Sequence, residues 1–262
     1  MITKCGLVPP ETLGVDELFA RYRDRDRPGL REMQEHEDDP QKRDEQDRKV
    51  LANARLERIR FIGVFDTVGS LGIPGDIGKV FARRYQFHDT RLSGYVDIAR
   101  HAVAIDEDRP EFEPTLWTAV PIPVPGHETS VEQRWFVGAH ADVGGRGGNS
   151  REAHPLSDLT REWIADEARD AGLTIDPPQR PLTGDEWRSP YGDPFARWLR
   201  GAARFVPGRH PLLRPVKMTE HETLNRSVLQ RWQDAGMDYH PRNPNLLAWL
   251  RREVNAQQPS VG

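Results

Sequence analysis

The sequence predicts an α/β fold in which a mostly parallel sheet is flanked by helices. Three features predict it: short apolar runs typical of buried strands, amphipathic stretches at helical spacing, and glycine-rich turns directly after two of the apolar runs. Strands that are apolar along their whole length and end abruptly at polar residues are typical of parallel sheets, which are covered on both faces. Ligands bind such sheets at the carboxyl ends of the strands.

The N-terminal part contains a polar segment and a first strand. Residues 21–49 are dominated by charged and amide side chains, so we expect a surface excursion there, either a solvated helix or a mobile segment. A helix over about 45–55 then leads into the apolar run 58–65, which predicts a buried strand ending at Asp66. The following TVGSLGIPGDIG carries four glycines and a proline, which indicates a loop at the carboxyl end of this strand.

The middle of the chain continues the alternation of helix and strand. Apolar residues at helical spacing predict a helix over about 95–105. PTLWTAV at 114–120 and VEQRWFVGA at 131–139 are two further strand candidates, separated by a proline-rich connection.

The C-terminal part is predicted to be mainly helical. Residues 154–173 form an amphipathic helix with Gly172 as its C-cap, and further helices are expected at 221–232 and 244–254. Residues 174–218 are rich in Pro, Gly, Trp and Arg without a clear period, which indicates an irregular, cap-like segment. There is no internal repeat and no sharp break, so we expect a single domain over 1–262 with two excursions.

Composition argues against several classes of protein. The 37 basic and 41 acidic residues give a net charge of -4, which does not favour nucleic acid as a partner. The single cysteine, Cys5, excludes an internal disulfide and a thiolate zinc cluster. No segment has the length of a transmembrane helix and the N-terminus lacks a signal peptide, so we expect synthesis in the cytoplasm. The first strand is followed by no GxGxxG and no Walker pattern, and we expect no cofactor.

Asp66 and His140 are the candidate catalytic residues. Each follows a predicted strand and precedes a glycine cluster, so both side chains are expected at the same edge of the sheet. An aspartate and a histidine placed together can act as an orienting acid and a base. The aspartate also precedes the histidine, as in the α/β-hydrolases. The alternative is structural, because an aspartate at a strand end often caps the next loop and a histidine often binds a backbone carbonyl.

Other polar residues carry weaker signals. His88–Thr90, Arg100 and His101 are interpreted as loop capping and helix-face packing, and Ile105–Arg109 as a helix end with solvated charges. By ligand type, Asp66, His140 and Asp142 could hold a metal ion, which keeps a metal-dependent hydrolase as an alternative. The HxD spacing is a weak signal, however, and neither HExxH nor HxxEH accompanies it.

Several blocks of the sequence together resemble one known family. They are GVFDTVGSLGIPG (63–75), FHDTRLSGYVDIARHAVAIDEDRPEFEPTLW (87–117), VEQRWFVGAHADVGG (131–145), SVLQRW (227–232) and YHPRNPNL (239–246). In this order they are similar to the successive blocks of an α/β-hydrolase domain family, catalogued as a domain of unknown function, that includes type VI secretion phospholipase effectors. The resemblance runs from about Cys5 to Leu247, with weaker agreement at 21–49 and 174–218.

The resemblance implies an α/β-hydrolase fold and a Ser-Asp-His triad that cleaves ester bonds, those of phospholipids in the characterised members. Asp66 matches the acid of the block GVFDTVGS, and His140 matches the histidine of the block GxHxDVGGG. Asp142 matches the aspartate of that block and is expected to be a structural partner of the loop. The chain departs from the family pattern at Ala141, where the family has serine, and at Arg146, where it has glycine. Effectors of this family often lack a cleaved signal peptide, so export is compatible with the sequence.

The nucleophile is the main departure from the family pattern. The family places its serine in a GxSxG elbow, followed by a helix that runs into a segment resembling ITKCGLVPP, which here is the N-terminus itself. No GxSxG occurs in the 262 residues, and Ser70 in VGSLG has Val68 where the first glycine is required. We therefore expect an N-terminally incomplete hydrolase fold that is inactive as this chain alone, with the serine supplied by an upstream segment or a second chain.

A non-catalytic function is the alternative hypothesis to the hydrolase. In it, the chain is a remnant of the same fold that binds a phospholipid or an immunity-type protein partner.

Overall fold

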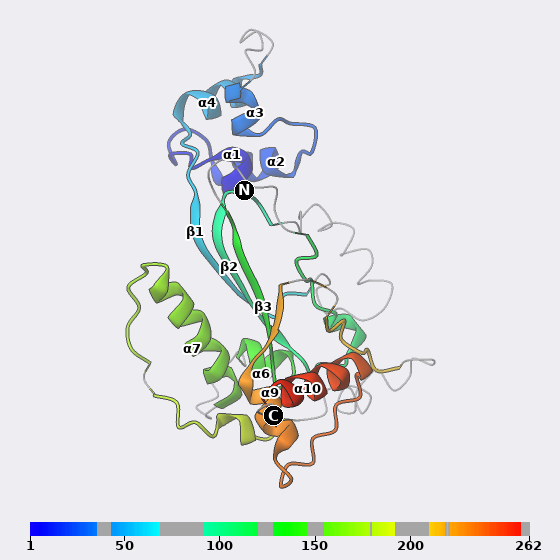
Figure 1. The fold of residues 1–262 in the computed structure, drawn as a ribbon. Helices are drawn as coiled ribbons and strands as arrows, with labels where there is room; N and C mark the ends of the chain where they lie inside the picture. Colours follow the sequence, from blue (N-terminus) through cyan, green and yellow to red (C-terminus); the bar gives the residue numbers. More distant parts are fainter. Residues whose placement is uncertain are drawn as a thin grey trace.

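The computed structural model describes residues 1–35, 43–68, 92–119, 128–145, 155–178, 180–191, 210–217, 219 and 221–257. In this part of the chain a parallel sheet occupies the centre, helices lie against it, and a group of short helices stands at one end (Figure 1). The predicted α/β class is confirmed, and the arrangement is that of an α/β-hydrolase-like fold.

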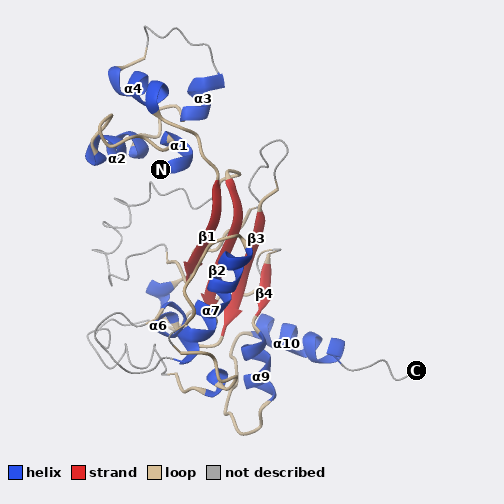
Figure 2. Cartoon of the chain, turned by 90° about the vertical axis from the view of Figure 1, so that its left-hand side faces the viewer, coloured by secondary structure: helices blue, strands red, loops and turns tan. Residues whose placement is uncertain are grey.

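The sheet has four strands in the order β1-β2-β3-β4, and every neighbouring pair is parallel (Figure 2). The strands are β1 (Ile59–Phe65), β2 (Val96–Ala104), β3 (Ser130–Phe136) and β4 (Glu222–Leu224). Phe65 pairs with Ala102, and Ala104 pairs with Phe136, so β1, β2 and β3 end close together. All carboxyl ends therefore meet at one edge of the sheet.

Helices cover the sheet through two apolar clusters. One cluster joins Ala102, Ala104 and Phe136 to Trp163 of α7 (Pro155–Asp170). The other contains Trp135 and Val103, and it takes in buried residues of α9 (Arg226–Gln233) and α10 (Pro244–Gln257). Adjacent residues of one strand thus enter different clusters, which is the alternation expected of a strand covered on both faces. The short helix α6 (His140–Gly144) follows β3 at the carboxyl edge.

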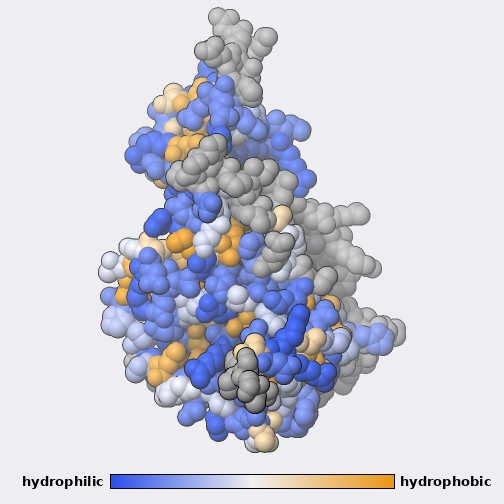
Figure 3. Space-filling model, viewed as in Figure 1, coloured by the Kyte–Doolittle hydropathy of each residue, from blue (hydrophilic) through white to orange (hydrophobic). Residues whose placement is uncertain are grey.

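The group of short helices at the other end of the sheet is built from the polar N-terminal segment. It consists of α1 (Ile2–Cys5), α2 (Val15–Arg23), α3 (Leu30–Glu35) and α4 (Glu45–Asn53). Leu13, Leu30, Met33 and Val50 form a small core of their own among these helices. The face seen in Figure 3 is mostly hydrophilic, with small apolar patches over these helices.

The prediction that residues 21–49 form a solvated surface excursion is wrong for part of this segment. Arg21 is only 1% exposed, and its guanidinium donates to Asp47 at 3.0 Å and to the carbonyl of Pro28 at 2.8 Å. An arginine can be buried when its charge is paired and its donors are used. The sequence did not indicate this pair, because most of the other charged residues that the structure describes in this segment are exposed.

The predicted helix at 95–105 is wrong, because these residues form β2. β2 lies between β1 and β3 and is buried on both faces, so its apolar residues show no two-residue alternation. The apolar positions also fit a spacing of 3.6 residues, and the polar side chains Arg100 and His101 find partners inside the fold. Arg100 pairs with Glu167 of α7 at 2.5 Å.

Two other predicted elements also differ. Residues 114–119 form no strand beyond one isolated bridge, from Pro114 to Val68, because both backbone polar groups of Trp117 bind the side chain of Gln133 instead. The predicted helix at 221–232 begins only at Arg226. Its first residues form β4, and the Asn225 side chain then caps α9 by accepting from the amide of Ser227.

The remaining predicted helices and strands agree with the structure in the described residues, whereas most of the predicted loop TVGSLGIPGDIG lies outside them. The strands at 58–65 and 131–139 and the helices at 45–55, 154–173 and 244–254 correspond to β1, β3, α4, α7 and α10. Within 174–218 the described residues contain one single-turn helix, η3 (Glu186–Arg188). Among the described residues no helix has the length and apolar character needed to cross a membrane.

The Arg21 pair gives a first prediction. Arg21→Ala should lower the free energy of unfolding by about 3 kcal/mol, because it leaves the buried carboxylate of Asp47 without its main partner. Urea denaturation and hydrogen exchange of the α2 and α4 amides measure the effect. Arg31→Ala removes an exposed pair with Glu35 and should leave stability nearly unchanged. Equal losses in the two variants would contradict a special contribution of Arg21.

Candidate active site

Asp66 stands at the carboxyl end of β1 in a strained conformation. Its φ is +37°, which is unusual for a residue with a Cβ and is found most often at functional sites and turns. Its amide donates to Ala102 at 2.7 Å, and its Oδ1 accepts from the amide of Ala104 at 2.9 Å. The side chain is fully buried. The carboxylate is therefore fixed by the end of the neighbouring strand β2.

Arg214 provides the charge that balances Asp66. Its two terminal nitrogens donate to Oδ1 and Oδ2 of Asp66 at 3.0 and 3.1 Å, and its Nε donates to the carbonyl of Glu107 at 2.9 Å. Burial by itself raises the pKa of Asp66, but the hydrogen bond from His140 and the positive charge of Arg214 outweigh it, so this pKa lies below the ordinary value. Asp66 is thus an anion at neutral pH.

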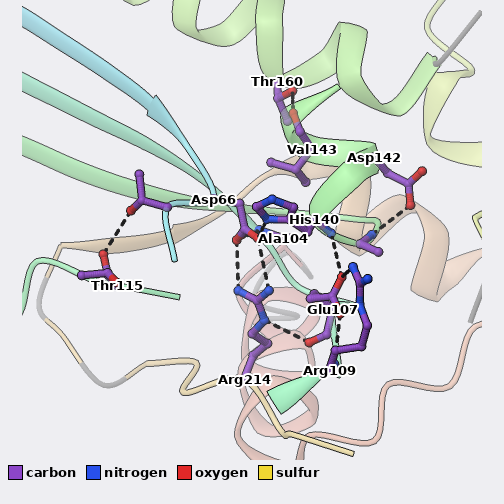
Figure 4. Close-up of polar contacts among 12 residues, drawn as sticks. Asp66, Ala104, Glu107, Arg109, Thr115, His140, Asp142, Val143, Thr160 and Arg214 are labelled. Carbon is purple, nitrogen blue, oxygen red and sulfur yellow. Dashed lines mark hydrogen bonds and ion pairs between the residues drawn. The ribbon is translucent and has the colours of Figure 1, made fainter. Parts of the chain in front are cut away.

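His140 faces Asp66 from the first residue of α6. Its Nδ1 lies 2.7 Å from Oδ2 of Asp66 (Figure 4), and 30% of its side-chain surface is exposed to solvent. Because Asp66 is ionised, Nδ1 carries the proton and donates a hydrogen bond to the carboxylate. Nε2 then carries the lone pair, and it makes no hydrogen bond to any described residue.

A stack of side chains holds the imidazole from the side. The ring of Phe112 lies 5.0 Å from that of His140, and the guanidinium of Arg109 lies 3.7 Å above the Phe112 ring. Arg109 is held in turn by two hydrogen bonds to the buried carboxylate of Glu107, at 2.7 and 2.8 Å. Glu107 also accepts from the backbone amide of His140 at 3.2 Å. The histidine is therefore restrained at both its ring and its backbone.

Asp142 lies close by but has a local role. Its Oδ2 accepts from the amide of Ala139 at 3.0 Å, in the first turn of α6. Asp66 is already bound by Arg214, so Asp66, His140 and Asp142 do not converge on a common point. Within the described residues no group of three or more His, Cys, Asp or Glu side chains could hold a metal ion. The metal-dependent alternative thus has no support from this donor set.

This arrangement has the parts of an acid–base pair. A buried anion orients an imidazole through Nδ1, and the second nitrogen is open to accept a proton from another group. Residues 1–167 match a family model. This family is described as the catalytic domain of Tle1-like phospholipase effectors of the type VI secretion system. The chain belongs to this family. Comparisons with curated proteins and with solved structures each gave no match.

The part matched to the phospholipase effector family contains both predicted site residues. The structure brings Asp66 and His140 together as expected, and it places Asp142 in the local role expected of it. Ser70, His88–Thr90 and Arg146 lie outside the described residues.

Sequence patterns did not identify Asp106, Glu107 and Arg214 as part of this site. Asp106 and Glu107 were interpreted as solvated charges at a helix end, but they follow the buried strand β2. They bind the backbone of Gly138–His140, which we call the histidine loop. Arg214 was hidden in the irregular segment 174–218. A signal was present, since it is the only charged residue of the stretch LLRPV, and an arginine among apolar residues indicates a buried partner of opposite charge.

His101 was also misinterpreted, since it belongs to a strand and not to a helix face. Its Nε2 accepts from the amide of Thr67 at 3.1 Å, and its Nδ1 faces Gln133 at 3.4 Å. Burial lowers the pKa of His101 to about 4, so it is neutral at physiological pH. It fixes the backbone directly after Asp66.

The Asp66–Arg214 pair gives a second prediction. Arg214→Leu should lower the free energy of unfolding at neutral pH by about 3 kcal/mol or more, because an unpaired carboxylate is left buried. The stability that ionised Asp66 provides exists above the ordinary carboxyl pKa and is lost as the pH falls through its lowered pKa. The difference between parent and variant should therefore shrink in acid. Urea denaturation at several pH values measures it.

Two variants serve as controls. Asp66→Asn combined with Arg214→Leu removes both charges and should be more stable than Arg214→Leu alone at neutral pH. Arg242→Leu changes an exposed arginine and should have little effect. A loss in Arg214→Leu that does not depend on pH would show that its packing matters and its charge does not.

Proposed function

We propose that Asp66 and His140 are the acid and the base of a Ser-Asp-His triad that hydrolyses ester bonds of phospholipids. The observation that carries the proposal is the 2.7 Å contact from Nδ1 of His140 to Asp66, with Nε2 unbonded among the described residues. Membership in a family of phospholipase effector catalytic domains supports the substrate class. The lowered pKa of Asp66 supports its role as a permanent anion.

The proposed reaction follows from the roles of the two nitrogens. Nε2 of His140 takes the proton of a serine hydroxyl while the serine oxygen bonds to the ester carbonyl carbon. Asp66 stabilises the resulting imidazolium, which then protonates the departing alcohol as the ester C–O bond breaks. In the second half, His140 takes a proton from water as the water oxygen bonds to the acyl carbon, and it then gives this proton to the serine oxygen as the bond between serine and acyl group breaks and the fatty acid leaves.

The serine is the part that these 262 residues do not supply in the usual motif, since no GxSxG occurs in them. We propose that it comes from a segment outside this sequence or from a second chain, and that it arrives on a strand parallel to β1. Among the described residues β1 pairs on one side only, with β2, and its apolar side chains are half-buried. A parallel strand beside β1 would end next to Asp66, where a following serine could reach Nε2 of His140.

The absence of GxSxG also favours a second candidate function. In it, the chain is a non-catalytic member that keeps the fold to bind a lipid or a protein partner. A satisfied Asp66–His140 pair is compatible with this function, because the pair needs no serine to be stable. The membership in a family of secretion-system effectors supports export in either case.

The third prediction concerns ester hydrolysis. The 262-residue chain alone should be inactive on a fluorogenic short-chain ester and on phospholipid vesicles, whereas a version extended through the preceding coding sequence should be active. In the extended form, His140→Ala and Asp66→Asn should each lower kcat by at least about a hundredfold, because each removes one part of the proton-transfer pair.

Matched substitutions control for general damage. His240→Ala changes an exposed histidine, and Asp97→Asn changes an aspartate at the opposite end of the sheet, so both should keep full activity. If the extended form is folded but hydrolyses neither substrate, the non-catalytic function is favoured. Turnover by the 262-residue chain that survives His140→Ala would reject the proposed triad.

A further inference from the structure

Three consecutive backbone amides lead up to the imidazole of His140, and each donates to a different carboxylate. The pairs are Gly138 with Asp106 at 2.7 Å, Ala139 with Asp142 at 3.0 Å and His140 with Glu107 at 3.2 Å. Backbone amides that point at ionised carboxylates form hydrogen bonds about twice as strong as neutral ones. The position of the histidine is thus set through its backbone as well as through its ring.

The three carboxylates differ in what they connect. Asp142 belongs to the same turn as the amide that it accepts, so it caps α6 locally. Glu107 also accepts two hydrogen bonds from the guanidinium of Arg109. Asp106 also binds a described side chain from the C-terminal part, because the hydroxyl of Tyr239 donates to its Oδ1 at 2.9 Å. Asp106 therefore links the histidine loop to the apolar cluster that contains Tyr239 and residues of α9 and α10.

The contact of Asp106 with Gly138 is unusually complete. The amide of Gly138 donates to Oδ2 of Asp106, and the carbonyl of Gly138 accepts from the amide of Asp106 at 3.1 Å. One residue thus satisfies both backbone groups of the other. Gly138 has a φ of +112°, and a Cβ there would lie 2.8 Å from the Cβ of Asp142. The loop conformation therefore requires glycine, whose flexible backbone needs an external restraint.

The restraint on Asp106 continues into the C-terminal layer. Tyr239 is buried, and the guanidinium of Arg231 on α9 lies 4.7 Å from the ring centre of Tyr191 and 5.7 Å from that of Tyr239. Arg231 is held in place by the carbonyls of Trp187 and Ser189. The orientation of Asp106 thus depends on groups that are themselves packed and bonded.

We propose that Asp106 is a positioning residue: held by Tyr239, it fixes Gly138 and so places the imidazole of His140 against Asp66. This inference deepens the proposed function, since it rests on His140 being the base. It assigns to Asp106 no contact with substrate. Its effect passes through the backbone from Gly138 to His140.

The protonation of Asp106 follows from its surroundings. Burial raises its pKa to about 6, against the hydrogen bonds from Gly138 and Tyr239, which lower it. The titratable or charged side chains that act on its carboxyl are Tyr239, Tyr191 and Arg231. Above this pH the carboxylate is ionised and binds Gly138 strongly. Below it the acceptor is neutral and weaker, so the restraint on the histidine loop loosens as the pH falls.

The test uses signals that do not require catalysis. In the parent protein, NMR should show a strongly downfield proton for Nδ1 of His140 and slow hydrogen exchange of the Gly138 amide. Asp106→Ala should remove the downfield proton and speed the exchange of Gly138 by about tenfold or more. Asp106→Asn should keep both signals, because an amide oxygen can still accept from Gly138 and its NH2 group can donate to Tyr239.

Further variants separate positioning from loss of stability. Tyr239→Phe keeps the ring and removes one hydrogen bond to Asp106, so Gly138 should exchange faster, but less so than in Asp106→Ala. Asp97→Ala breaks the pairing with Arg58 at the far end of the sheet and should leave both signals unchanged. Unchanged signals in Asp106→Ala, or equal losses in Asp97→Ala, would overturn the proposal.

A pH titration provides an independent readout. It is done in a His140→Ala background, so that the titration of the imidazole does not contribute. The amide resonance of Gly138 should shift with a midpoint near pH 6 in this background, and Asp106→Asn should abolish the shift. A shift that persists in Asp106→Asn would contradict the proposal. If the NMR results hold but the extended chain shows no esterase activity, the positioning stands and the proposed catalysis falls.

Discussion

The buried ion pair between Asp66 and Arg214 is the interaction on which the rest of the site depends. Asp66 is fully buried in a left-handed backbone conformation, and its carboxylate accepts from four nitrogens, on Ala104, Arg214 and His140. These groups come from β2, from the segment before β4 and from α6. A single carboxylate thus joins three parts of the chain that are far apart in the sequence. Arg214 makes this possible, because a buried carboxylate without a paired cation would be protonated or would destabilise the fold.

The contacts around this pair close into a ring. Arg214 reaches from Asp66 to the carbonyl of Glu107, the side chain of Glu107 binds Arg109, and Arg109 stacks on Phe112. Phe112 packs against His140, which returns to Asp66. Each charge in the ring has an opposite charge beside it, so the group can be buried without a large net charge. A closed ring also restrains every member from two sides, which lowers the freedom of the imidazole before any substrate is present.

The residues that the sequence analysis found and missed follow one physical rule. Asp66 and His140 were predictable because each stands where an apolar run meets glycines, and that pattern marks a strand end regardless of the rest of the fold. Asp106 and Glu107 also follow the end of a strand, β2, but no glycines come after them. They were missed because burial on both faces removes the alternation that identifies a strand. Arg214 could not be assigned to Asp66 by pattern, because 148 residues separate the two and only the tertiary fold joins them.

The contacts of the proposed acid, Asp66, and the proposed base, His140, form without a nucleophile. Every polar group of the imidazole and of Asp66 except Nε2 of His140 has a partner among the described residues, and none of these partners is a serine. The ring therefore does not need the serine for its own stability, since Arg214 and the backbone of β2 satisfy the acid and Asp66 satisfies the base. A serine that approaches Nε2 would add one hydrogen bond to a base that is already oriented. If a nucleophile comes from a separate strand, as proposed, the acid and the base would not have to rearrange when it docks.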